Sequence, residues 1–154
     1  MRNMRRKDRA ITESEARSLL RKAEYGVLST VSGDGNPYGV PLSFCVIDDG
    51  IYFHCAVEGQ KIDNIEYNKS VSFCVVGDTE ILPDKFGTKY ESVIVFGEVE
   101  EVFNSEKQIA LEGLLHKYSP EFFDRGIKYI EDLRDKTRVF KISINKLTGK
   151  ARRQ

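Results

Sequence analysis

The sequence predicts a mainly β protein, a small antiparallel β-barrel of six strands with a few helices. Six segments have the period-two alternation or the β-branched and aromatic composition of strands, and turn residues separate several of them. Helices are expected only at the start, after the third strand and before the last strand. This spacing favours a barrel over a sandwich built from regular hairpins.

The first three strands are expected close together in the chain. Residues 25–31 (YGVLSTV) lead through a turn into residues 38–47 (YGVPLSFCVI), where apolar side chains alternate along one face. The sequence DDG at 48–50 predicts a hairpin turn, after which residues 51–56 (IYFHCA) return antiparallel. The glycines within 33–39 lack dinucleotide-binding spacing and lie between two strands, so we interpret them as part of a turn.

The second half of the chain adds three strands and two longer helices. The strands are expected at 70–76, 90–103 and 137–147. One helix is expected to begin after Asn104 or Ser105 and to reach His116. The second is expected over 119–133, with Pro120 at its first position.

Composition narrows the class of protein. The 154 residues fit one domain (1–154), and 40% hydrophobic with 31% charged residues is typical of a globular protein. The 24 basic and 24 acidic residues cancel, which argues against nucleic-acid or membrane-surface binding through global charge. Basic residues cluster at both ends, but without interleaved aromatic residues they favour solvated tails or dimer-rim charges over nucleic-acid arms.

Cysteine and histidine usage points to a cytoplasmic protein without a metal site. Cys45, Cys55 and Cys74 form an odd set with no C-x-x-C motif, so we interpret them as reduced core thiols. No apolar segment suggests a signal peptide or a membrane span. The two histidines lack zinc-ligand spacing, and no metal is expected.

Several predicted strands are apolar on both faces, most clearly in VPLSFCVI (40–47) and SVIVFG (92–97). In a monomer, one of these faces would remain in water. A homodimer that buries it is therefore expected.

One short helix begins with an unusual charge. After the strand that ends at Ala56, the segment 57–60 (VEGQ) leads into a helix whose apolar face is Ile62 and Ile65. Lys61 lies in its first turn, where the partial positive charge of the helix favours an acid or a bound anion. Either Lys61 is solvated, or it shares a phosphate group with the backbone N–H groups of the helix.

Four segments, in order, resemble the pyridoxamine 5′-phosphate oxidase-like flavoproteins, and most closely the nitroimidazole-resistance (Nim) branch. They are MRRKDR, GNPYGVPLSF, IYFHCAVEGQKIDNI and SVIVFGEVE, and the similarity extends from residue 4 to about residue 150. The resemblance implies a split β-barrel of six antiparallel strands. It also implies a homodimer with FMN at two sites between the subunits, and the phosphate beside Lys61 would then belong to FMN.

The resemblance also assigns positions to the site. Backbone groups along the strand 39–43 would meet the polar edge of the isoalloxazine ring, residues 53–56 would lie beside the ring and ribityl chain, and residues 59–62 would surround the phosphate. Relatives often have a basic residue where this chain has Gln60, which removes one possible charge from the phosphate site. The implied cofactor-binding residues are Val40, Pro41, Leu42, Ser43, Phe53, His54, Cys55, Ala56, Gly59, Lys61 and Ile62.

His54 is the candidate catalytic residue because it is the only group of intermediate pKa among these positions. A hydrogen-bonded structural role for His54 stays open. The implied function is an FMN-dependent oxidoreductase that reduces nitroaromatic compounds with NAD(P)H or another donor. A relative of pyridoxamine 5′-phosphate oxidase, or a haem- or flavin-binding protein without turnover, is the alternative. The oxidase itself is disfavoured, because this chain has no Trp and ends in INKLTGKARRQ.

Overall fold

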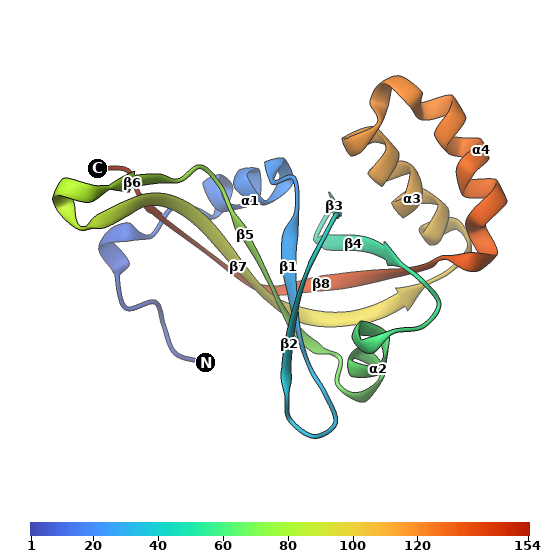
Figure 1. Ribbon diagram of the computed structural model, residues 1–154, viewed down its shortest axis with the longest axis horizontal. Helices are drawn as coiled ribbons and strands as arrows, with labels where there is room; N and C mark the ends of the chain where they lie inside the picture. The colour runs from blue at the N-terminus through green and yellow to red at the C-terminus, as the bar shows by residue number, and fades with distance from the viewer.

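A computed structural model describes residues 1–154, and its centre is one strongly curved antiparallel sheet of eight strands (Figure 1). The strands are β1 (Gly26–Val31), β2 (Pro37–Leu42), β3 (Cys45–Ile47), β4 (Gly50–Cys55), β5 (Ser70–Val76), β6 (Glu80–Leu82), β7 (Gly87–Val102) and β8 (Arg138–Arg152). Seven of them follow the order β2-β1-β5-β7-β8-β4-β3, and β6 pairs only with β7. The predicted mainly β, barrel-like fold is confirmed.

The number of strands differs from the six that the sequence predicts. The expected strand 38–47 breaks at Ser43 and Phe44 into β2 and β3, which lie at opposite ends of the strand order. At the break, the Phe44 backbone forms hydrogen bonds with side chains instead of with a neighbouring strand. Its N–H donates to the Tyr118 hydroxyl at 3.0 Å, and its carbonyl accepts from Lys117 Nζ at 2.9 Å. β6, the additional strand, has only three residues and lies between the strands predicted at 70–76 and 90–103, where no strand was expected.

The sheet curves around the long β7–β8 pair. The register between these strands shifts between Phe96 and Gly97. A Cβ atom at Gly97 would lie 2.0 Å from the backbone oxygen of Ser143, so a larger residue would push the two strands apart. Gly97 therefore permits the bulge that bends the sheet at this point.

Four α-helices surround the sheet: α1 (Glu13–Lys22), α2 (Gln60–Tyr67), α3 (Asn104–Tyr118) and α4 (Phe123–Leu133). The α3–α4 pair lies at the opposite end of the molecule from the β6–β7 hairpin (Figure 1). α4 begins later than the sequence predicts. Ser119 makes no capping hydrogen bond, and Pro120 starts a short 3₁₀ turn, Pro120–Phe122, before the helix. None of the helices combines the length and apolar character needed to cross a bilayer.

Two apolar clusters form the interior, and β4 contributes to both because its side chains alternate between faces. Ile51 and Phe53 belong to the main cluster of 16 buried residues inside the curved sheet. Tyr52 belongs to a second cluster of 8 buried residues beneath α3 and α4. Because side chains alternate, His54 lies on the same face of β4 as Tyr52, the face that is turned toward α3 and α4.

The three cysteines are free thiols. Cys45 is buried in the second cluster, and burial raises the pKa of its thiol to about 11. Cys55 packs against the main cluster, and burial also raises its pKa. Burial thus keeps these two thiols protonated at neutral pH.

Candidate functional site

The connection from β4 to α2 provides open space at the start of a helix. β4 ends at Cys55, and α2 begins at Gln60 after Gly59, which has a φ of 147°. Side-chain-bearing residues rarely adopt this conformation, and no atom lies within 4 Å of the position that a Cβ would take. Gly59 thus permits the turn and leaves the helix entrance uncovered.

The first turn of α2 has free hydrogen-bond donors. No side chain caps the helix, and the Asp63 amide donates to the Gly59 carbonyl at 3.1 Å. The backbone N–H groups before Asp63 have no partner within the helix, and they lie at its positive end. Asp63 is the only acid in this turn, and its side chain is exposed. The entrance of α2 can therefore accept an anion.

Lys61 adds a cation to the same turn. Its side chain is half-buried, its Nζ lies 5.9 Å from the centroid of the Phe53 ring, and it takes part in none of the ion pairs of the structure. Phe53 itself is fully buried and stacks on Phe140, with 5.6 Å between the ring centroids. A rigid aromatic pair thus lies beneath an ammonium group that no carboxylate neutralises.

His54 follows Phe53 and lies on the opposite face of β4. Part of its surface is open to solvent, while apolar side chains of α3 and α4 cover another part. This desolvation, and secondarily the charge of Lys61, lower the pKa of His54. His54 is therefore neutral at pH 7, with one ring nitrogen able to donate and the other able to accept a hydrogen bond.

β2 presents a free strand edge. It pairs with β1 on one side, with Pro41 opposite Val27, and it ends the strand order on the other side. Pro41 is exposed, as expected for a proline on an edge strand, while Val40 and Leu42 pack against the main cluster. Backbone groups on the free edge are available to a ligand.

The structure brings His54, Cys55 and Lys61 into one neighbourhood. The charge of Lys61 adds to the lowering of the His54 pKa and partly opposes the rise that burial causes in the Cys55 pKa. Phe53 and Ile62 are buried in the main cluster, so their side chains support the site from below. Ser43 and Ala56 are exposed.

Sequence reasoning missed a buried polar chain that anchors α2. The Gln60 side-chain amide donates to Asn64 Oδ1 at 2.7 Å, and the Asn64 amide donates to Thr30 Oγ1 at 2.9 Å. The Thr30 hydroxyl in turn donates to the Tyr38 carbonyl on β2 at 3.4 Å. Asn64 and Thr30 are each only 1% exposed. These hydrogen bonds tie α2 to the β1–β2 hairpin. Their only signal in the sequence was Asn64, a polar residue between Ile62 and Ile65.

Arg138 was also missed, because it lies far along the chain on β8. Its Nη2 lies 2.7 Å from Glu101 Oε1 and 3.6 Å from Glu66 Oε1, and its Nη1 donates to the Val57 carbonyl at 3.3 Å. These contacts hold the segment between β4 and α2 against the sheet.

A family model described as pyridoxamine 5′-phosphate oxidase matches residues 12–151. This chain belongs to the pyridoxamine 5′-phosphate oxidase family. The match confirms the family resemblance, and the curved sheet agrees with the split barrel. None of the curated proteins matches the sequence.

Three solved structures illustrate the range of related folds. A protein from Bacteroides thetaiotaomicron, provisionally named for 5-nitroimidazole antibiotic resistance, is 24% identical, with a TM-score of 0.76 and coverage of 92% of this chain and 86% of its own. An FAD-binding protein from Mesorhizobium loti is 25% identical, with a TM-score of 0.65 and coverage of 94% and 97%. An FAD- and haem-binding protein from Mycobacterium smegmatis is 15% identical, with a TM-score of 0.78 and coverage of 93% and 72%. Proteins that share this fold therefore include binders of flavin and of haem.

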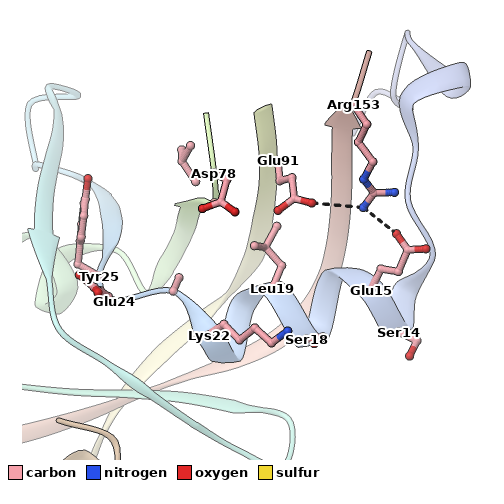
Figure 2. A pocket seen from close by; sticks show the side chains of 13 residues that line it. Ser14, Glu15, Ser18, Leu19, Lys22, Glu24, Tyr25, Asp78, Glu91 and Arg153 are labelled. Carbon is pink, nitrogen blue, oxygen red and sulfur yellow. Dashed lines mark hydrogen bonds and ion pairs between the residues drawn. The ribbon is translucent and has the colours of Figure 1, made fainter. Parts of the chain in front are cut away.

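A cavity of about 740 Å³ lies apart from the residues of the candidate site, between α1 and the strands β5 and β7 (Figure 2). Within it, Arg153 Nη2 lies 3.1 Å from Glu15 and 3.4 Å from Glu91 (Figure 2). None of the site residues implied by the family lines this cavity. No group of three or more His, Cys, Asp or Glu side chains is placed to hold a metal ion.

Proposed function

We propose that this protein is an FMN-dependent oxidoreductase that reduces nitroaromatic compounds with electrons from NAD(P)H or another donor. The observation that carries the proposal is the uncapped start of α2, where Gly59 leaves open space and Lys61 is an unneutralised cation. The 5-nitroimidazole resistance protein and the FAD-binding protein with this fold support the choice of cofactor and substrate class. Free thiols at all three cysteines support a cytoplasmic location.

The residues of this chain fit the phosphate group of FMN. Backbone N–H groups at the start of α2 would donate to its oxygens, and Lys61 would add a charge-assisted hydrogen bond. Gln60 does not contribute in this arrangement, because its side-chain amide donates to Asn64. One cation and the helix terminus would thus hold the phosphate, and the buried Asn64–Thr30 contact would keep the helix in place.

The remaining site residues would orient the ring system. The free edge of β2 would offer backbone groups of Val40, Pro41 and Leu42 to the polar edge of the isoalloxazine ring, and Ser43, Cys55 and Ala56 would lie beside it. When bound, FMN supplies the transfer of two electrons. His54, neutral at pH 7, would hold a hydrogen bond at the substrate. To act as an acid it would first take up a proton from solvent and then pass that proton on as the imidazolium.

Catalysis is tested by mixing the FMN-loaded protein with NADPH or NADH and a nitroaromatic compound such as metronidazole. Oxidation of the nicotinamide that depends on both protein and nitro compound supports the proposal. Dithionite serves as a donor that needs no nicotinamide site. FMN that stays reduced in the presence of the nitro compound with either donor would contradict nitroaromatic reduction.

The alternative is a binding protein without turnover. The FAD- and haem-binding protein with this fold supports it, as does the solvent-accessible imidazole of His54, a group able to ligate iron. Absorbance separates the two, because a haem-loaded protein is dominated by a Soret band and a flavoprotein shows flavin bands.

We further propose a homodimer with FMN at the interface. Val76 on β5 and Ile94 on β7 are 57% and 39% exposed, although they lie on central strands of the sheet. Covering such side chains stabilises a dimer by about 25 cal/mol per Å². Sedimentation is expected to show a dimer at micromolar concentration. A stable monomer of 17.6 kDa that retains flavin would contradict a two-subunit site.

A further inference from the structure

A second, smaller crevice opens beside His54. It has a volume of about 140 Å³ and lies between the end of β4 and the α3–α4 pair. Its walls are mainly apolar and include Leu111, Leu114, Leu115, Ile130 and Leu133. Its polar lining includes His54 from β4 and Arg134, which follows α4.

The size and walls of the crevice fit one aromatic ring. An apolar cavity of about 150 Å³ can hold a benzene molecule, and small-molecule sites combine apolar walls with a few polar groups. A bicyclic or longer ligand would extend beyond the leucine side chains into solvent. The crevice therefore favours a compound with a single planar ring.

The charge of the crevice selects the substituent on that ring. The Arg134 guanidinium donates to the uncharged Gln108 amide and takes part in none of the ion pairs of the structure. No carboxylate lines the crevice. Lys107 precedes Gln108 on α3, and its Nζ donates hydrogen bonds to the backbone carbonyls of Arg134 at 2.8 Å and of Thr137 at 2.6 Å. Arg134 thus extends from a fixed backbone with a free charge, which suits two coplanar oxygen atoms.

We propose that this crevice binds a single-ring aromatic compound carrying a carboxylate or nitro group, with its two oxygens at Arg134 and its ring edge at His54. This inference rests on the proposed function and deepens it, because a nitro compound bound in the crevice would be the electron acceptor, but the binding itself does not need FMN. His54 would then connect the crevice to the cofactor neighbourhood at Lys61.

The test measures binding of benzoate, nitrobenzene and toluene by calorimetry, to the flavin-free and the FMN-loaded protein. Arg134→Gln is expected to weaken benzoate binding about tenfold or more and to leave toluene binding unchanged. Leu133→Phe, which adds volume to the lining of the crevice, is expected to weaken all three. Arg125→Gln is the matched control, because its guanidinium lies over the Phe122 ring at 5.4 Å and outside the crevice. A stronger effect of Arg134→Gln on benzoate than on nitrobenzene identifies the carboxylate as the preferred group, and the reverse identifies the nitro group.

Imidazole NMR signals locate the bound ring. Benzoate is expected to shift the signals of His54 more than those of His116, which stacks on Phe123 and does not line the crevice. Equal benzoate affinity in wild type and Arg134→Gln, or an unshifted His54 signal at saturation, would overturn the proposal. Benzoate binding without any FMN binding would contradict only the flavoprotein function, whereas tight FMN binding without benzoate or nitrobenzene binding would contradict only the crevice.

Discussion

His54→Gln is expected to slow nitroaromatic reduction by about 10²- to 10⁴-fold while FMN remains bound, the range typical of a positioned acid or base. Glutamine keeps a hydrogen-bonding side chain but cannot deliver a proton. Burial lowers the pKa of His54, and its exposed part lets the imidazole take up a proton from solvent before passing it on. The measurement is single-turnover oxidation of reduced FMN by the nitro compound.

His116→Gln provides the control, since His116 is exposed on α3 and stacks on Phe123. Full activity of His54→Gln would assign His54 a structural role. Loss of FMN with normal activity of the remaining holoprotein would assign it to cofactor binding.

Lys61→Met is expected to weaken FMN binding by about 10- to 150-fold, equivalent to losing one charge-assisted hydrogen bond of about 1.5–3 kcal/mol. Methionine retains much of the aliphatic stem beside Phe53. Riboflavin, which lacks the phosphate, is expected to bind wild type and variant equally. Titrations of both flavin-free proteins, followed by flavin fluorescence, measure the four affinities.

The flavin-free variant provides a second readout. Removing a cation from a helix start leaves the free energy of unfolding unchanged or raises it by a few tenths of a kcal/mol. Lys69→Met, a change at an exposed lysine beyond the end of α2, is expected to leave both flavin affinities unchanged. If Lys61→Met weakens the binding of FMN and riboflavin equally, or weakens neither, Lys61 is solvated and the phosphate lies elsewhere.

Strand positions could be predicted from the sequence because alternating apolar side chains have to face the core. The expected strands at 51–56 and 70–76 agree with β4 and β5 to within a residue. The break at Phe44 could not be predicted, because it depends on Lys117 and Tyr118 reaching its backbone from the end of α3. Local patterns do not report such long-range hydrogen bonds.

In the candidate site, too, local features could be predicted from the sequence and long-range contacts could not. Gly59 and Lys61 could be singled out because a glycine and a cation at a helix start are local features. Arg138 could not, since its role depends on β8 lying beside β4. The crevice could not be predicted either, because Arg134 and His54 line one crevice only after α3 and α4 pack on the outer face of β4.

The most direct test of the FMN proposal is the identity of the small molecule that the purified protein releases on denaturation. Mass spectrometry is expected to identify FMN, in a ratio approaching one per chain after reconstitution, and the native protein is expected to show flavin absorbance bands. Release of haem with a dominant Soret band, or failure of the flavin-free protein to bind added FMN, would contradict the proposed function.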